Sequence, residues 1–205
     1  MSNRRSLLKG AAALGTSAMA LAALNGEARA AEGEPVPIGS ALPLSGFAAA
    51  DGIEFKNGLE LAASEINAMG GILGRPIELH IEDTKEMGAD IVTQAMQRLI
   101  DRHSCPAIIN GYSVGTNMVE MDTAADNDVI FVHYNTLVSH NDKFLSDRER
   151  YYGSFQGDPP EKWYGPGCLA FLKNLVDTGQ WKPSNNKLAL VPSANEYSIV
   201  IANAI

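Results

Sequence analysis

Hydrophobic positions in the first half of the chain follow two alternating patterns. Short apolar runs at 36–42 and 77–81 have the length of buried strands. Between these runs, apolar residues recur every three or four positions, which is the period of an amphipathic helix: Phe55, Leu59, Ala62, Ile66 and Met69. Gly70 and Gly71 then end the helix. A strand, a helix and a second strand in this order predict a βαβ unit with parallel strands and a right-handed crossover.

The same alternation continues to residue 134. It predicts helices at 88–102 and 118–125, and strands at 106–110 and 129–134. We therefore expect an α/β fold in which a doubly wound parallel sheet forms a lobe long enough to bury its own core. Ligands of such sheets bind where the strands end, so the loops that follow the strands are the candidate binding edge.

Beyond residue 134 the pattern is less regular. Residues 137–150 are polar and charged and predict a surface loop, and residues 151–155 are expected to be extended. The sequence Gly-Asp-Pro-Pro at 157–160 predicts a hinge, because proline interrupts helices and strands alike. The elements expected after the hinge are a helix at 161–178, a strand at 187–191 and a helix that begins near Ser198.

These patterns divide the chain into three parts. Residues 1–30 form a leader, residues 31–156 form an N-terminal lobe, and residues 157–205 form the hinge and the beginning of a second α/β lobe. One helix, one strand and part of another helix cannot close a hydrophobic core. We therefore expect the chain to be a truncated form of a longer, two-lobed protein.

The leader has the three features of an export signal. A basic head at 3–9, an apolar run at 11–24 and the sequence Ala-Arg-Ala at 28–30 match the requirements of signal peptidase. The apolar run is too short, and too rich in alanine and glycine, to span a membrane, so no membrane insertion is expected after processing. The pair Arg4 and Arg5 resembles a twin-arginine signal, and an ordinary secretory signal is the alternative. Both routes lead to a bacterial periplasm.

Charge and cysteine content narrow the possible partners. Removal of residues 1–30 lowers Lys+Arg from 16 to 12 and Asp+Glu from 24 to 23, so the formal charge changes from −8 to −11. An acidic chain without a basic stripe is not expected to bind nucleic acid. Cys105 and Cys168 are expected to be free and mostly buried thiols, because they belong to separate predicted elements. Four scattered histidines give no metal-ligand spacing, so neither a metal nor a cofactor is expected.

A family resemblance is carried by an ordered set of short motifs. These are L-S-G at 44–46, F-x-N-G at 55–58, E-I-N-A-x-G-G-I-x-G at 65–74 and E-D at 82–83. Together they resemble the opening of the leucine/isoleucine/valine-binding protein family, the type I periplasmic solute-binding proteins of ABC importers. The resemblance implies two lobes that close on a small solute. It also implies an ABC transporter membrane permease as the partner.

In this family the first lobe supplies hydroxyls and backbone amides from the loops after its first, third and fourth strands. The resemblance therefore implies these ligand-binding residues, the last of them from the second lobe: Ser45, Ser113, Thr116, Asn135, Thr136 and Tyr197. Uncharged donors suit a carboxylate or a zwitterion. Other interpretations stay open, since Ser45 fits a tight turn, Ser113 and Thr116 fit helix capping, and Tyr197 fits a core position. Tyr112 and Phe47 are further candidates.

Two departures from the family leave the solute open. Asp51 stands where the branched-chain amino-acid binders tend to carry an aromatic residue, and Tyr112 and Asn117 replace a small, serine-rich loop. An acid at the cleft mouth would attract a cationic or hydrogen-bond-donating ligand, unless Asp51 is a solvated loop residue. A branched-chain amino acid, an amide, a urea-like solute and a small organic acid all remain candidates.

The sequence does not predict an enzyme. It contains no H-E-x-x-H or G-x-x-x-x-G-K motif. We therefore expect the extracytoplasmic solute-binding component of an ABC importer. A ligand-sensing module for a chemoreceptor or kinase is an alternative, because sensing and transport use the same clamp. An α/β hydrolytic enzyme is a third, less favoured hypothesis.

Overall fold

A five-stranded sheet organises the computed structural model, which describes residues 31–111 and 117–205. Its strands are β1 (Val36–Leu42), β2 (Ile77–Asp83), β3 (Ala107–Asn110), β4 (Ile130–His133) and β5 (Ser154–Gln156). The strand order is β2-β1-β3-β4-β5, and the β1–β3, β3–β4 and β4–β5 pairs are parallel. The amide of Thr84, just after β2, donates to the carbonyl of Leu42 at the end of β1. Strands β1 and β2 therefore end at the same edge of the sheet.

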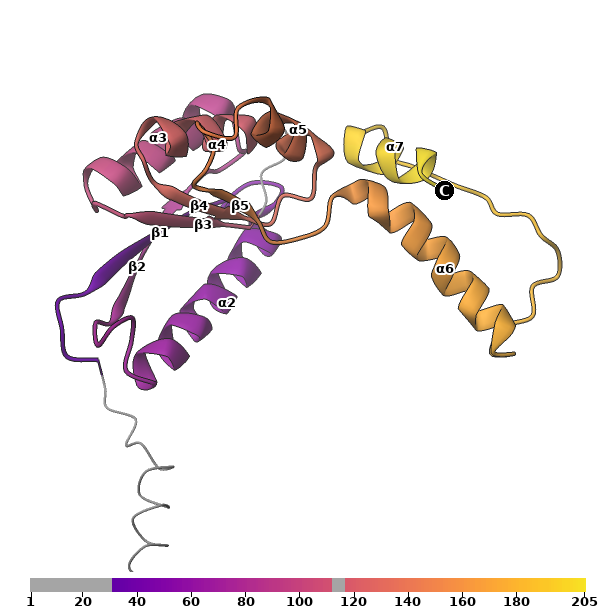
Figure 1. Cartoon of the computed structure of the whole chain (residues 1–205), viewed down its shortest axis with the longest axis horizontal. Helices are drawn as coiled ribbons and strands as arrows, with labels where there is room; N and C mark the ends of the chain where they lie inside the picture. Colours follow the sequence, from indigo (N-terminus) through magenta and orange to yellow (C-terminus); the bar gives the residue numbers. More distant parts are fainter. Residues whose placement is uncertain (1–30, 112–116) are drawn as a thin grey trace, which may run out of the picture. The chain divides into compact units, whose positions relative to one another are not determined.

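Helices cover both faces of this sheet. They are α2 (Ala49–Ala68), α3 (Ala89–Asp101), α4 (Asn117–Asp126) and α5 (Val138–Ser146). Helices α3, α4 and α5 lie on one face, and the first part of α2 lies on the other (Figure 1). This arrangement follows from the strand order, because the chain crosses from β1 to β2 in one direction and from β2 to β3 in the other. The predicted doubly wound α/β lobe is confirmed.

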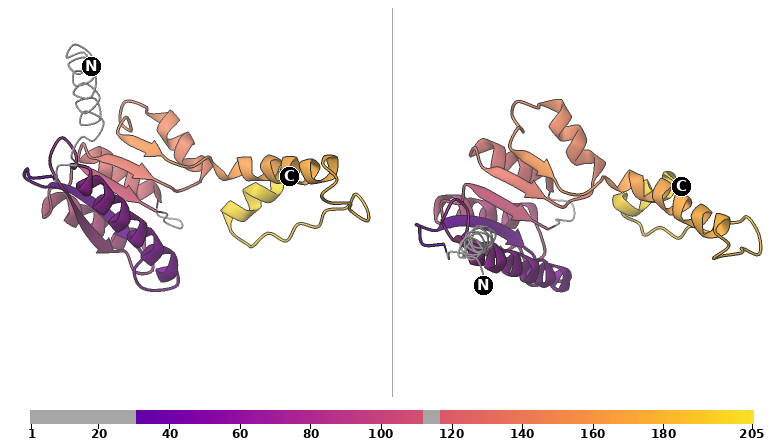
Figure 2. Two further views of the ribbon diagram at one scale, coloured as in Figure 1. Left: turned by 90° about the horizontal axis from the view of Figure 1, so that it is seen from below. Right: turned by 60° about the horizontal axis from the view of Figure 1, so that its bottom comes forward.

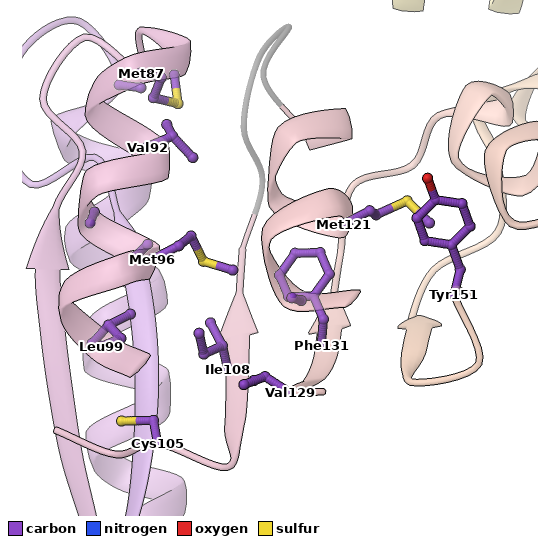
Figure 3. Packing of buried hydrophobic residues seen from close by; sticks show 14 residues of the cluster. Met87, Val92, Met96, Leu99, Cys105, Ile108, Met121, Val129, Phe131 and Tyr151 are labelled. Carbon is purple, nitrogen blue, oxygen red and sulfur yellow. The ribbon is translucent and has the colours of Figure 1, made fainter. Parts of the chain in front are cut away.

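The hydrophobic core lies between the sheet and helices α3 and α4. Val92, Met96 and Leu99 project from α3 and are fully buried, as the apolar periodicity of 88–102 predicts. They meet Ile108 of β3 and Phe131 of β4, which are also fully buried (Figure 3). Two adjacent parallel strands and two helices thus share one apolar layer, which fixes the positions of the strand ends.

Contacts divide the chain into two units, one with residues up to Val36 and Leu61–Ile77, the other with Pro37–Glu60 and Glu78–Ile205. In the first unit, the side chain of Asn67 bonds both backbone groups of Ile77, accepting from the amide at 2.6 Å and donating to the carbonyl at 3.0 Å. Arg75 donates to the carbonyls of Glu34 and Pro35. Asn67 and Arg75 therefore stabilise the turns between α2 and β2.

The segment 157–205 contains helices and no strand. A 3-10 helix, η1 (Glu161–Trp163), leads into α6 (Tyr164–Asp177), and α7 (Glu196–Asn203) lies beside α6 (Figures 1 and 2). The strand predicted at 187–191 is wrong. Leu188, Leu190 and Val191 are exposed, and no neighbouring strand is present among the described residues to complete a ladder. Among residues 31–111 and 117–205, no helix combines the length and apolarity of a membrane span.

Two further predictions need correction. Residues 138–146 form helix α5 instead of a loop, because the carboxylate of Glu161 accepts the amide of Val138 at 2.7 Å and His140 is buried. Both cysteines are free, as expected, but Cys168 is exposed on α6, whereas Cys105 is buried. Burial raises the pKa of Cys105 to about 11, and the nearby negative charge of Glu78 adds to this effect.

Candidate functional site

The strand order creates a switch point at the carboxyl ends of β1 and β3. The chain leaves β1 toward β2 on one side, while β3 pairs with β1 on the other side. The connections from these two strands therefore diverge onto opposite faces of the sheet, which opens a crevice between the strand ends. In sheets wound in this way, ligands bind at that point.

A pocket of about 300 Å³ lies at this edge. Its lining residues come from the end of β1, the first turns of α2, the residues directly after β3 and β4, and the segment after β5: Leu42, Pro43, Asp51, Gly52, Phe55, Gly111, Tyr134 and Asp158. The volume is at the lower end of the range for small-molecule sites. The rule that ligands bind in the loops after parallel strands therefore gives the position of this pocket.

Two glycines allow the walls of the pocket to approach one another. A Cβ atom added to Gly52 would overlap the carbonyl oxygen of Pro43, so the first turn of α2 lies directly against the residue that follows β1. A Cβ atom added to Gly111 would lie 2.9 Å from the ring of Phe55. The rings of Phe55 and Tyr134 are 5.9 Å apart and inclined by 60°, and they form an aromatic wall.

The charges of the pocket are negative. Asp51 lies in the first turn of α2, and the Gln156 side chain donates to the carbonyl of Asp158 at 2.9 Å. These two aspartates are the charged residues in the described lining, which contains no lysine or arginine. The interpretation of Asp51 as a loop residue is wrong, because α2 begins at Ala49.

A buried polar network ties together the elements beneath this edge. Asn110, the last residue of β3, accepts the amide of Ala41 at 2.8 Å and donates to Glu120 of α4 at 2.6 Å. The second carboxylate oxygen of Glu120 accepts from the side chain of Asn135 at 3.4 Å. All three side chains are buried, so losing one partner would leave polar atoms unsatisfied in the interior.

Ser45 makes a structural contact. Its hydroxyl donates to Asp83 at 2.7 Å, and the other carboxylate oxygen of Asp83 accepts the amides of Leu44 and Lys85, each at 2.8 Å. Partial burial on its own raises the pKa of Asp83, but these hydrogen bonds outweigh it and lower the pKa below its ordinary value. Ser45 therefore stabilises the turn after β1, and its role toward a ligand stays a prediction.

Asn135, Thr136 and Tyr197 are not among the described residues that line the pocket. Asn135 is 3% exposed, and the carbonyl of its neighbour Thr136 accepts the amide of Glu161 at 2.7 Å. Tyr197 lies in the first turn of α7, where its ring is 6.4 Å from that of Tyr164. Ser113, Thr116 and Tyr112 lie outside the described residues. Phe47 is 71% exposed and does not belong to the pocket lining.

Sequence reasoning places Asp51 at the cleft mouth, but it misses Phe55 and Asp158 among the residues that line the pocket. The apolar spacing places Phe55 on the apolar face of an amphipathic helix and does not indicate that it lines a pocket. The signal that could find it is its position near the start of α2, which follows the loop after β1. Tyr134 directly follows β4, so the strand-end rule contains the signal that finds it. Asp158 was assigned to a hinge, and no local pattern indicates that it reaches this edge.

A second buried group in the lobe is a pair of histidines. His133 of β4 and His140 of α5 are each 1% exposed, and their ring centroids are 4.5 Å apart. Burial, with a smaller contribution from the neighbouring His140, lowers the pKa of His133 to about 3, although hydrogen bonding with the backbone of Asn135 acts in the opposite direction. In the described part of the chain, no group of three histidine, cysteine or acidic side chains is placed to hold a metal ion.

Comparison with known proteins identifies the family. The profile of the family described as "Periplasmic binding protein" matches residues 35–160, which is more than half of the 205 residues. The chain belongs to the periplasmic binding protein family. The resemblance carried by the motifs between residues 44 and 83 is thereby confirmed. No curated protein sequence matches the chain.

Solved structures of periplasmic binding proteins share the fold. A Silicibacter pomeroyi protein, proposed to be a branched-chain amino acid ABC transporter, is 51% identical, with a TM-score of 0.79 over 83% of this chain and 43% of its own. The substrate-binding protein of a branched-chain amino acid transporter from Streptococcus pneumoniae, in complex with isoleucine, is 21% identical, with a TM-score of 0.62 over 83% and 45%. A solute-binding protein from R. palustris, in complex with 4-hydroxybenzoate, is 18% identical, with a TM-score of 0.62 over 83% and 42%.

The expected type I periplasmic binding protein fold is therefore confirmed for the N-terminal lobe. The chain spans less than half of the length of each of these three proteins. The two more distant structures bind different classes of solute, an amino acid and an aromatic acid, so they show the fold and leave the solute of this chain open.

Proposed function

We propose that this chain carries the first lobe of an extracytoplasmic solute-binding component of an ABC importer. Its role is to capture a small organic solute, a branched-chain amino acid or a similar amide or carboxylate, and to deliver it to the membrane permease. The observation that carries the proposal is the pocket of about 300 Å³ at the switch point of β1 and β3. Residues 157–205 begin the second lobe of the clamp, and the protein acts in the bacterial periplasm.

The pocket suits a solute that is partly apolar. Leu42, Pro43 and the rings of Phe55 and Tyr134 supply an apolar surface, and the aspartates at the rim supply polarity. Small-molecule sites have this composition, because apolar contact gives affinity and a few polar groups fix the orientation. The buried Asn110–Glu120 bond holds the strand end that precedes Gly111, so this wall of the pocket is fixed by the fold.

The test is a titration of the whole chain with a panel of amino acids, amides and small carboxylates, followed by two-dimensional NMR. We expect at least one compound to produce saturable shifts at Leu42, Phe55 and Tyr134, with low affinity because a single lobe supplies one wall of the clamp. Tyr134→Ala should abolish these shifts. The matched control is Tyr152→Ala, since Tyr152 is exposed and lies outside this pocket.

The outcomes separate the hypotheses. A panel that produces no saturable shift at the pocket, or shifts that Tyr152→Ala removes as well, would contradict solute binding at this edge. Chemical turnover of a bound compound would favour the hydrolytic alternative. Co-purification with an ABC permease supports delivery for transport, whereas co-purification with a chemoreceptor or kinase ectodomain supports the sensing alternative.

A further inference from the structure

Glu161 is a buried residue that joins two segments of the chain. It is the first residue of η1 and is 2% exposed. Its amide donates to the carbonyl of Thr136 at 2.7 Å, and its carboxylate accepts the amide of Val138 at 2.7 Å. Burial of a carboxylate costs free energy unless hydrogen bonds compensate for it. One backbone bond and one side-chain bond therefore fix residue 161 against the loop after β4.

Helix α5 depends on this contact at its N-terminus. The amides of the first turn have no acceptor within their own helix and need one from elsewhere. The residue before the helix is Leu137, which makes no side-chain capping bond, and the first turn contains no acidic residue. The carboxylate of Glu161 supplies the acceptor, and its negative charge lies where the helix dipole favours it. Glu161 therefore caps α5 from a distant position in the sequence.

The segment that leads to Glu161 is also held at its other end. The amide of Gly157 donates to the carbonyl of His133, the last residue of β4, at 2.8 Å. A Cβ atom added to Gly157 would lie 2.6 Å from the ring of Tyr134, so the segment runs directly over that ring. Residues 158–160 lie between the two attachments, and two of them are prolines with a fixed φ. We call residues 157–161 the strap.

The strap carries one pocket residue and covers another. Asp158 lies within the strap and lines the pocket, and Tyr134, beneath Gly157, lines it as well. We propose that Glu161 is a positioning residue for this pocket. It anchors the strap to the loop after β4, so that residues 157–161 move as one body with the first lobe and the clamp bends C-terminal to Glu161. The use of the pocket rests on the proposed function, whereas the anchor itself is tested without a solute.

The test follows backbone amides of the whole chain by NMR. In the wild type we expect order parameters near 0.85 for Gly157 and Asp158, the value of rigid backbone. Glu161→Ala should accelerate hydrogen exchange of the Val138 amide by about thirtyfold, because a hydrogen bond to a charged group is lost. The order parameter of Asp158 should then fall below about 0.6, while that of Phe131 in β4 stays unchanged.

Two further variants separate anchoring from a general loss of stability. Glu161→Gln keeps an acceptor oxygen, so it should return exchange of the Val138 amide to within about fivefold of the wild type. Val92→Ala, the control, removes buried apolar groups from α3 and should leave the order parameter of Asp158 unchanged. Should Glu161→Ala not fold, Glu161→Asp, whose carboxylate is one methylene shorter, takes its place with the same expected changes.

Three results would each overturn the inference: a mobile Asp158 in the wild type, a rigid Asp158 after loss of the Glu161 side chain, or an equal loss of order in Val92→Ala. None of these measurements includes a solute, so they leave the proposed solute binding unaffected. Conversely, a solute panel that produces no shift at the pocket would leave the anchor in place.

Discussion

At the scale of single residues, the binding edge depends on polar side chains that are buried beneath it. Asn110 connects β1 to α4 by accepting from Ala41 and donating to Glu120. Asp83 performs a similar task nearer the surface, where it accepts from Ser45 and two backbone amides. These contacts are directional, so they fix the strand ends and loops more specifically than apolar packing alone.

His133 makes the stability of the lobe depend on pH. Its pKa is about 3 in the folded chain, whereas an unfolded histidine has a pKa of about 6.5. Below pH 6.5 the unfolded chain therefore binds more protons than the folded chain, and the free energy of unfolding falls by up to about 1.4 kcal/mol per pH unit until the pH approaches 3. His133→Phe keeps a ring that can stack on Phe131 and removes this titration.

We expect His133→Phe to lose less stability than the wild type between pH 7 and pH 4.5, as measured by urea denaturation at both values. The comparison at pH 7 serves as the reference, because His133 is neutral there in the folded chain and mostly neutral in the unfolded chain. An unchanged difference in unfolding free energy between the two pH values would show that His133 does not carry the acid sensitivity.

At the scale of elements, the entry of α2 sets the width of the pocket. Gly52→Ala would place a methyl group against the carbonyl of Pro43, so we expect a loss of about 1–3 kcal/mol of unfolding free energy. Gly58→Ala is the matched control in the same helix, because its added Cβ would have no atom within 4 Å apart from its chain neighbours and the nearby backbone of its own helix. That change should stabilise the chain by about 0.5–1 kcal/mol, since alanine favours helix. Equal effects of the two substitutions in denaturation would contradict the close contact at Gly52.

A local sequence pattern predicts a helix or strand correctly when the apolar residues of that element pack against the core of the same lobe. Strands β1 to β4 and helix α3 belong to this class, because their apolar faces pack within one lobe. Helix α5 does not, because its first amide is held by Glu161, 23 residues away. The strand predicted at 187–191 fails for the opposite reason, since its apolar residues have no neighbouring strand with which to pair.

The candidate site, too, was predictable in part from the sequence. The strand-end rule finds the edge, because it depends only on the order of strands and helices. The rule does not identify every side chain that lines the pocket. The lining also depends on where the helix after each strand begins, and on which polar loop atoms already make hydrogen bonds within the protein. Asp51 faces the pocket from a helix that begins earlier than expected, and Ser45 is bonded to Asp83. Sequence patterns contain neither piece of information.

At the scale of the whole molecule, the proposed clamp needs two walls. The N-terminal lobe at 31–156 supplies one of them, and η1 and α6 expose large apolar residues, including Trp163 and Phe171, each 60% exposed. Exposed aromatic residues on a helix are typical of a surface that packs against further structure. This observation agrees with the proposal that residues 157–205 begin a second lobe.

The proposed export of the molecule can be tested through its arginine pair. The twin-arginine route reads Arg4 and Arg5 as an address, whereas the secretory route needs a basic head and an apolar run, which lysine preserves. We therefore expect the double change Arg4→Lys and Arg5→Lys to retain the precursor in the cytoplasm of a Gram-negative host, as measured by cell fractionation. Lys9→Arg, the control, should be exported normally, and the periplasmic form should begin at Ala31. Normal export of the double variant would establish the secretory alternative.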